Sequence, residues 1–313
     1  MIQIGLTCGG VWWGPELFQD IERRGFDSIW TGEHIVFHRT ILDAISVVAG
    51  LAAVTERVEI GPAAIMVPLR HPTLLAKELA AIDIMSNGRL IVTAGVGGDY
   101  PKEFDACGVP HARRGRRTTE MVEVMRKYWT EDRFSYHGQA IELDNVWMEP
   151  KPISPCGPRI WMAGRSNAAI ERAVRLGDGY MPYMFTPEQC ADAMRDIRET
   201  SERLEHPLRD RFTLSAFIYT SLHDDRDYAR RLAVEDLGWR YNQPFDRLVD
   251  KYCVFGTGEQ VREQLNAFAD AGVTHFVLAP VQEEGGEREL VARYDEEVLR
   301  PMKQALTTPA ANG

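Results

Sequence analysis

Short, almost uninterrupted apolar segments recur along the chain. Each is followed by a longer stretch in which apolar residues return every three or four positions. IVTAG within residues 88–98 and FVLAP within residues 274–280 show the first pattern, which is typical of strands buried on both faces of a parallel sheet. Strands are therefore predicted at residues 2–7, 27–32, 57–67, 88–98, 158–164, 178–183, 212–222 and 274–280.

The stretches that follow these strands carry the signals of helices. Pro15 stands near the first turn of the first one and Gly25 follows its last turn, which are the usual places for these residues at helix ends. Helices are predicted at residues 15–25, 42–55, 71–86, 116–129, 166–177, 187–204, 224–237, 258–272 and 287–306. Eight repeats of a strand followed by a helix predict a single (β/α)8 TIM barrel domain over residues 1–313, with an open doubly wound sheet as the alternative.

Two segments interrupt this rhythm. Residues 130–157, rich in proline and aromatic residues, follow the fourth strand and its helix, and residues 238–257 follow the seventh. We interpret both as insertions after strands 4 and 7. Long excursions from a compact fold are more often functional than idle.

The composition favours a cytoplasmic protein that acts on small molecules. The 313 residues carry a formal net charge of −10, which argues against a nucleic-acid partner because such a partner requires a basic face. The five cysteines form no CxxC pair, so we expect neither a zinc site nor a disulfide framework. The N-terminus lacks the pattern of a secretory signal, and the apolar stretch AISVVAGLAAV is too short to span a bilayer, which takes about 20 residues.

In a barrel of this kind the active site lies at the carboxyl ends of the strands. Glu33 and His34 directly follow the second strand there. A histidine changes protonation near neutral pH, which suits proton transfer, although a polar loop would also explain the pair. A metal site assembled from Glu33, His34 and His38 has no compelling partner elsewhere in the sequence, so no metal is expected.

Two glycine-containing turns are candidate cofactor sites. GVGGDY at residues 95–100 lacks the last glycine of the dinucleotide-binding fingerprint, so Gly95 and Gly97 mark either a tight turn or a close approach of the backbone to a flat ring. In AGRSN at residues 163–167 a glycine and Arg165 precede a helix whose first N–H groups could bind phosphate. The alternative is that Ser166 or the next residue only caps the helix.

Several segments together resemble the bacterial luciferase-like family of flavin- and deazaflavin-dependent oxidoreductases. They cover roughly residues 1–200 and 253–280 and read GFDSIWTGEHI, VEIGPAAIMVPLRHPTLLAKELAAIDIMSNGRLIVTAGVGG, RRGRRTTEMVEVMRKYWTED, MEPKP, PRIWMAGRSNAAIERAVRLGDGY and VFGTGEQV. The resemblance implies a (β/α)8 barrel, usually dimeric, that binds FMN or coenzyme F420 at its C-terminal rim. Because the F420-dependent oxidoreductases are the subgroup it resembles most, F420 is the expected cofactor and FMN the alternative.

By position, the resemblance also assigns roles to residues. His34 matches a histidine near the reactive ring, and Glu33 matches the acid beside it. The residues that match the cofactor site are Ala63 and Ala64, where the family has a non-proline cis peptide behind the ring, and Gly164, Arg165 and Ser166, where it holds the cofactor phosphate. Gly98 stands where the sugar-phosphate dehydrogenase branch has a glutamate, so a sugar phosphate is not the expected substrate.

Three functions are compatible with these features. The first is hydride transfer between F420 and a small, apolar or aromatic organic substrate, and the second is an FMN-dependent monooxygenase supplied by a separate reductase. The third is a flavin-binding protein without turnover. The expected lining of the substrate pocket is aromatic and consists of Trp12, Trp13, Phe37 and Tyr183.

Overall fold

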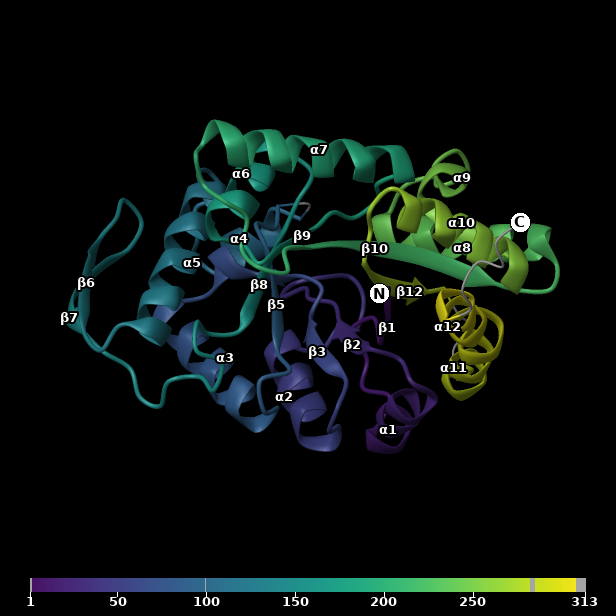
Figure 1. Ribbon diagram of the computed structural model, residues 1–313, viewed down its shortest axis with the longest axis horizontal. Helices are drawn as coiled ribbons and strands as arrows, with labels where there is room; N and C mark the ends of the chain where they lie inside the picture. The colour runs from purple at the N-terminus through teal and green to yellow at the C-terminus, as the bar shows by residue number, and fades with distance from the viewer. Residues whose placement is uncertain (1, 99, 282–284, 308–313) are drawn as a thin grey trace.

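The computed structural model describes residues 2–98, 100–281 and 285–307 and confirms the predicted barrel (Figure 1). Its parallel sheet has the strand order β3-β2-β1-β12-β10-β9-β8-β5-β4. The strands are β1 (Gln3–Thr7), β2 (Ser28–Thr31), β3 (Glu59–Pro62), β4 (Ile65–Met66), β5 (Ile91–Gly95), β8 (Arg159–Ala163), β9 (Gly179–Met181), β10 (Thr213–Leu222) and β12 (His275–Pro280). The third predicted strand is therefore divided into β3 and β4 by Ala63 and Ala64.

The sheet nearly closes on itself. The N-terminal strand β1 pairs in parallel with the last strand, β12. At the two ends of the strand order, β4 pairs with β5, and Ile60 of β3 forms an isolated parallel bridge with Leu90 just before β5. Because every strand of the ring is parallel, all carboxyl ends lie on one rim, where a barrel enzyme builds its site.

Helices surround the sheet (Figure 1). The longer ones are α1 (Pro15–Arg24), α2 (Ala44–Val54), α3 (Pro72–Met85), α5 (Arg114–Thr130), α6 (Asn167–Leu176), α7 (Pro187–Arg203), α8 (Arg226–Tyr241), α10 (Gly258–Asp270), α11 (Glu287–Tyr294) and α12 (Arg300–Thr307). Local chemistry fixes several of their starts. For example, Thr257 and Gln260 form a capping box at the start of α10, in which each side chain binds the other residue's backbone N–H.

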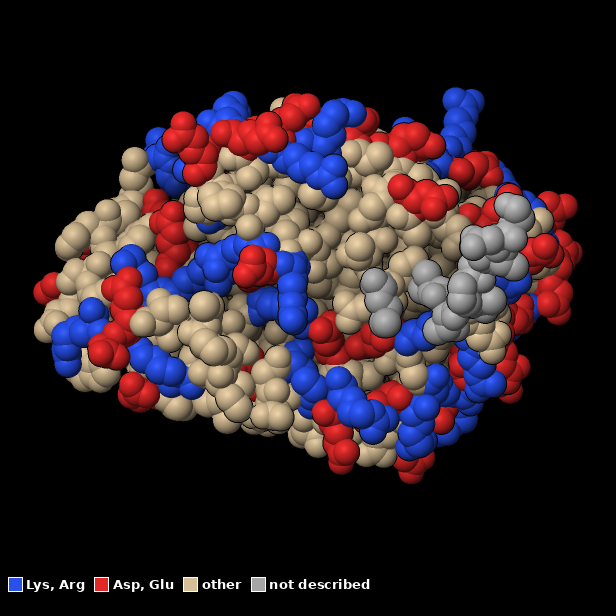
Figure 2. Space-filling model, in the orientation of Figure 1, with Lys and Arg blue, Asp and Glu red and all other residues tan. Residues whose placement is uncertain are grey.

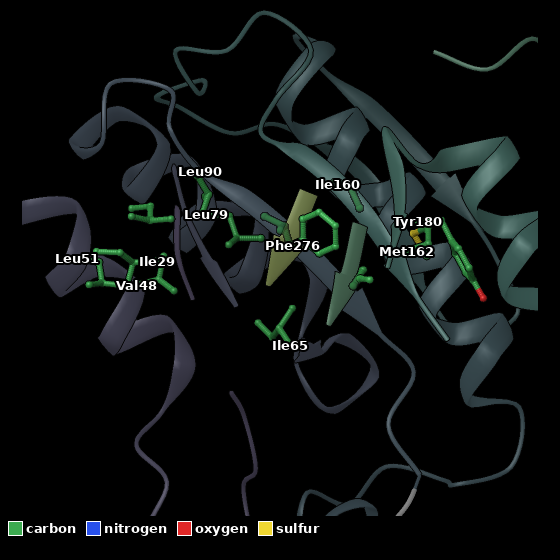
Figure 3. Close-up of a cluster of buried hydrophobic side chains, with 14 of the residues drawn as sticks. Ile29, Val48, Leu51, Ile65, Leu79, Leu90, Ile160, Met162, Tyr180 and Phe276 are labelled. Atoms are coloured by element: carbon green, nitrogen blue, oxygen red, sulfur yellow. The ribbon is translucent and has the colours of Figure 1, made fainter. Parts of the chain in front are cut away.

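The main core lies between the strands and the helices. Figure 3 shows Ile29 of β2 near Val48 and Leu51 of α2, and these three side chains are buried. The same core continues around the barrel to Ile160 of β8 and Phe276 of β12. This continuous apolar layer holds the strands in register and so fixes the positions of the loops at their ends.

A second, smaller core fills the barrel interior. The indole rings of Trp30 and Trp161 stack there with centroids 5.2 Å apart, and both residues are fully buried. Glycine makes room for them, because a Cβ on Gly61 would lie 2.8 Å from a ring carbon of Trp30. At the amino ends of the strands, His275 and Ser28 share a 2.7 Å hydrogen bond. The interior is thus packed, and open space is left to the carboxyl rim.

The two predicted insertions have different structures. Residues 130–157 contain an antiparallel hairpin of β6 (Phe134–His137) and β7 (Glu142–Val146), which extends from the barrel in Figure 1. Residues 238–257 instead hold the end of α8, the short helix α9 (Val249–Tyr252) and the strand β11 (Cys253–Gly256), which pairs in parallel with β10. The second segment therefore contributes to the sheet. Its strand was missed because four residues are too few for a recognisable pattern.

The visible surface carries both signs of charge. Figure 2 shows Lys and Arg interspersed with Asp and Glu on this face. In the described part of the chain, no helix is long and apolar enough to cross a membrane.

Candidate active site

A pocket of about 790 Å³ opens at the carboxyl rim of the barrel. Its lining includes residues at or near the carboxyl ends of most barrel strands: Cys8, Gly32, Ala63, Gly95, Ala163, Met181, Tyr219 and Pro280. A pocket of this size admits a ring cofactor together with a small substrate. The rim singled out by the sequence is therefore the place of the candidate site.

One wall of the pocket consists of backbone and very small side chains. The peptide bond between Ala63 and Ala64 is cis, as predicted, and both residues line the pocket beside Gly95 and Gly97. A Cβ added to Gly95 would lie 3.2 Å from the Cβ of Ala64. Gly98, which follows Gly97, has a φ of 121°, and a Cβ on it would lie 2.5 Å from Nε of Arg114. This wall suits the close approach of a flat ring.

Arginines flank this wall. Arg165 follows β8 and lies near three aromatic rings, those of Tyr183, Phe185 and Tyr252, with 5.7–5.8 Å between its guanidinium carbon and the ring centroids. Arg114, at the start of α5, donates a 3.0 Å hydrogen bond from Nε to the carbonyl oxygen of Gly97. Within the described ranges neither arginine has a carboxylate within 4 Å. Both guanidinium groups are thus available to an anionic group of a ligand.

The expected phosphate-binding segment is present only in part. Gly164 and Arg165 line the pocket. The side chain of Ser166 caps α6 by accepting a 3.3 Å hydrogen bond from the N–H of Ala169, and Ser166 is absent from the lining. The alternative interpretation of Ser166, a helix cap, is therefore the one observed. The reason is that its Oγ satisfies an N–H group that the helix leaves unpaired.

His34 contacts a carboxylate that the sequence did not reveal. Its Nδ1 lies 3.2 Å from Oε1 and 3.3 Å from Oε2 of Glu103, in the short helix α4 (Lys102–Ala106). The same carboxylate accepts the backbone N–H groups of Ile35 at 2.6 Å and of Val36 at 3.3 Å, and Glu103 is almost fully buried. An acceptor-only carboxylate places the proton on Nδ1 of His34, so Nε2 is left as a proton acceptor.

Glu33, which the resemblance matches to the acid beside the histidine, has partners other than His34. Its buried carboxylate pairs with Arg70 and accepts a 2.5 Å hydrogen bond from the N–H of Met66. Both residues lie in the loop after β2 and line the pocket, but their side chains have different partners. The carboxylates of Glu33 and Asp43, acting against the effect of burial, raise the pKa of Arg70. Glu33 thus fixes the loop after β4, and Glu103 takes the place beside the imidazole.

The aromatic residues expected around the substrate divide into two groups. Trp13, Phe37 and Tyr183 line the pocket, and the ring of Phe37 stacks on His34 with centroids 3.7 Å apart. Trp12 does not line it. Its ring packs edge-on against Phe18 of α1 with centroids 4.9 Å apart. The prediction for Trp12 is therefore wrong, because its indole packs on the side of Phe18 away from the pocket lining, where it is 38% exposed.

Several pocket residues escaped sequence reasoning. Glu103 and Arg114 lie beyond the fourth strand in a segment without a clear helix or strand pattern. Four more residues come from α8 and the loop after β2: Arg39, Asp236, Arg240 and Tyr241. The last two of these fell in the segment interpreted as an insertion. Their one sequence signal was a charged and aromatic helix end, which is common on protein surfaces.

Comparison with known proteins adds to this geometry. A family model described as luciferase-like monooxygenase matches residues 14–275. The chain is 31% identical over 196 residues to an FMNH(2)-dependent dimethylsulfone monooxygenase of Pseudomonas putida, which covers 62% of this chain and 52% of that protein. It is 26% identical over 298 residues to an F420-dependent glucose-6-phosphate dehydrogenase of Kineococcus radiotolerans, covering 84% and 86%. The chain thus spans about half the length of the first relative.

A solved structure shares the fold. An F420-dependent secondary alcohol dehydrogenase, in complex with an F420–acetone adduct, superposes with a TM-score of 0.83 at 19% identity. The superposition covers 95% of this chain and 98% of that one. At this identity the likeness concerns the arrangement of the barrel.

Proposed function

Because the chain belongs to the luciferase-like monooxygenase family, we propose that it is an F420-dependent oxidoreductase that transfers a hydride between F420 and a small apolar or aromatic organic substrate. Members of the family are flavin- or F420-dependent enzymes. The observation that carries the proposal is the combination of a flat wall of glycine and alanine with the His34–Glu103 pair in one pocket. The first feature suits a ring and the second suits a proton transfer.

The choice of F420 rests on the extent of similarity. The F420-dependent relative aligns with this chain over 86% of its own length, against 52% and 74% for two FMNH(2)-dependent dimethylsulfone monooxygenases. This supports F420 as the cofactor, although the higher identity, 31%, belongs to the shorter alignment.

The residues present fit a ring cofactor with an acidic tail. Ala63, Ala64, Gly95 and Gly97 would lie against the ring, since none of them carries a side chain larger than a methyl group. Arg165, after Gly164, would bind the phosphate through charge-assisted hydrogen bonds. F420 supplies a hydride acceptor or donor, so the protein itself has to orient the substrate and manage the proton.

His34 is the residue proposed for the proton. Its Nδ1 is held by Glu103, which leaves Nε2 to take a proton from a substrate hydroxyl or to return one to a carbonyl oxygen. Phe37 stacks on one face of the imidazole and keeps the ring from turning. Fixed orientation and a defined tautomer are what an acid–base histidine needs.

The second candidate is an FMN-dependent monooxygenase, favoured by the 31% identity to the FMNH(2)-dependent relative. An enzyme of this kind receives reduced flavin from elsewhere, so a separate reductase would be its partner. A protein that binds flavin without turnover is the least favoured candidate, because a flavin-binding role alone gives no reason to hold His34 in one tautomer.

We also propose that the protein is a homodimer, as its family resemblance implies. Support comes from α3, where Leu74 is 64% exposed and Met85 is 54% exposed. An interface that covered α3 would remove these apolar side chains from water. Light scattering should then give twice the 35.4 kDa mass of the chain.

A cofactor titration tests the proposed function. Apo protein is titrated with F420 and, separately, with FMN, and the fluorescence of each cofactor is followed. Micromolar binding of F420, with FMN at least about tenfold weaker, is expected, a difference of about 1.4 kcal/mol. Binding of FMN alone would establish the second candidate instead. If neither bound, both candidates would be rejected.

A further inference from the structure

One region of the pocket carries more positive than negative charge. Arg240 of α8 pairs closely with Asp236 one helical turn earlier. Arg39, from the loop after β2, reaches the same carboxylate at 3.9 Å, the outer limit of an ion pair. Both arginines line the pocket and their side chains are 20% and 23% exposed. Two guanidinium groups therefore share one carboxylate, so the cluster of Arg39, Asp236 and Arg240 has a formal charge of +1.

A structural role explains only part of this arrangement. Arg240 stands in the last turn of α8, where a cation is favourable, and the pair with Asp236 has the usual helical spacing. Neither fact accounts for Arg39. Its guanidinium lies over the indole of Trp239, 4.3 Å from the centroid, so it is positioned by stacking more than by charge. Burial and the nearby charge of Arg240 lower the pKa of Arg39. Among the described residues, the ion pair with Asp236 at 3.9 Å is the one that Arg39 forms, and it leaves the guanidinium able to bind a second anion.

Two tyrosines extend the region with further hydrogen-bond donors. The hydroxyl groups of Tyr219 and Tyr241 lie 2.7 Å apart. One of them donates to the other, so the accepting hydroxyl still has its own proton to donate. Among the described residues neither hydroxyl has a second hydrogen-bond partner. With Arg39 close by, this part of the pocket offers donors to any ligand, and the ligand has to supply acceptors.

We propose that the substrate is an organic monoanion, an apolar or aromatic acid whose carboxylate binds Arg39 and a tyrosine hydroxyl of the Tyr219–Tyr241 pair. The flat, forked guanidinium matches a carboxylate, and a single negative charge balances the single excess positive charge. The proposal names the substrate class of the proposed function and so rests on it.

The position of the region suits such a substrate. The loop that carries Arg39 also carries His34 and Phe37. It is fixed to the end of α8 by a 3.2 Å contact between Nε2 of His38 and the carbonyl oxygen of Trp239. A substrate held at Arg39 by its carboxylate would have its apolar part along Phe37 and its reacting carbon toward His34. The carboxylate thereby selects and orients the substrate and takes no part in the chemistry.

The test compares an anion with its neutral analogue. Binding of phenylacetate and phenylacetamide is measured by calorimetry and ligand-observed NMR, on protein with and without F420. Phenylacetate should bind at least about tenfold more tightly than the amide. Arg39→Gln should weaken phenylacetate about 10- to 100-fold, the usual cost of a lost charge-assisted hydrogen bond, and leave the amide unchanged. Arg39→Lys should recover part of the loss.

Two further variants strengthen the test. Asp236→Asn removes the internal competitor for both guanidinium groups, so it should tighten phenylacetate several-fold, an effect opposite in sign to Arg39→Gln. Arg195→Gln, on the exposed face of α7, is the matched control and should change nothing. Equal affinity for acid and amide, or an Arg39→Gln variant that binds both like the wild type, would overturn the proposal.

The same measurements separate this proposal from the proposed function. If Arg39→Gln weakened F420 in place of phenylacetate, the region would serve the cofactor and the substrate proposal would be overturned. If the predicted discrimination appeared in a protein that bound neither F420 nor FMN, the anion site would stand and the proposed function would be rejected.

Discussion

Replacing Glu103 by glutamine should move the imidazole proton of His34 from Nδ1 to Nε2. Nε2 could then no longer accept a proton from the substrate, while the shape of the site would be preserved. Glu103 accepts hydrogen bonds from the N–H groups of Ile35 and Val36 and from Nδ1 of His34. In Glu103→Gln, the amide oxygen can still accept from the backbone, but the NH2 group would have to face the imidazole. That group donates, and the amide oxygen already accepts the N–H groups of Ile35 and Val36 with its two lone pairs. Nδ1 would therefore become the acceptor, and the proton would move to Nε2.

The structure sets the size of two effects of Glu103→Gln, a loss of stability and a loss of turnover. Glu103 is 1% exposed, so its charge-assisted hydrogen bonds are little screened by solvent. Converting two or three of them into neutral ones should cost about 2–3 kcal/mol of stability, taking roughly 1 kcal/mol for each. Turnover should fall by about 10²–10⁴-fold, the range for losing an acid–base group or its correct tautomer.

The assay joins a spectroscopic and a kinetic readout. Nitrogen NMR of the labelled imidazole should show the His34 proton on Nδ1 in the wild type and on Nε2 in Glu103→Gln. Glu120→Gln is the control. Glu120 is also buried and accepts N–H groups, those of Gln139 and Ala140, outside the pocket. The Glu120→Gln protein should lose a similar amount of stability and keep the wild-type turnover. An Nδ1 proton retained in Glu103→Gln, or turnover within a few-fold of wild type, would refute this account of His34.

Three other outcomes are expected. His34→Ala should lower kcat by about 10²–10⁴-fold at nearly unchanged cofactor Kd; normal turnover would reduce His34 to a polar loop residue. Arg165→Ala should weaken the cofactor by about 1–3 kcal/mol in a titration, with little effect on unfolding, and an unchanged Kd would exclude Arg165 from the phosphate site. Burial lowers the pKa of His275 to about 3, so the unfolded chain takes up a proton near pH 6.5 that the folded one refuses. Stability should therefore fall by about 2–3 kcal/mol from about pH 6.5 to about pH 4.5. The free energy of unfolding of His275→Asn, measured with urea, should depend less on pH than that of the wild type. An equally steep dependence would mean that other groups cause the loss of stability.

The barrel was predictable because its signal is repeated. Eight buried strands produce eight apolar runs, and errors in any one of them leave the count intact. The exception is β11, whose four residues, Cys253–Gly256, gave no periodicity of their own. A strand that short is defined by its pairing with β10, which only the folded chain reveals.

The site was predictable where backbone chemistry defines it and not where distant side chains meet. Gly95 and Gly97 were singled out by the turn after their strand, and Ala63 and Ala64 by the family resemblance; all four line one pocket. The contact of His34 with Glu103 joins residues 69 positions apart, and nothing in the local pattern marks it. The partner of Glu33 was missed for the same reason, because Arg70 lies 37 positions further along the chain.

The central claim is that a ring cofactor lies against the wall formed by Ala63, Ala64 and the glycines after β5. Cofactor affinity of Ala64→Leu tests it most directly, because the larger side chain would occupy the space of the ring and would face the open pocket. The matched control is Ala53→Leu, on the exposed face of α2. The account predicts that Ala64→Leu raises the Kd of the cofactor at least about 100-fold, equivalent to about 2.7 kcal/mol. The control should bind the cofactor like the wild type, and both variants should keep the wild-type circular dichroism. Wild-type affinity in a folded Ala64→Leu protein would contradict it.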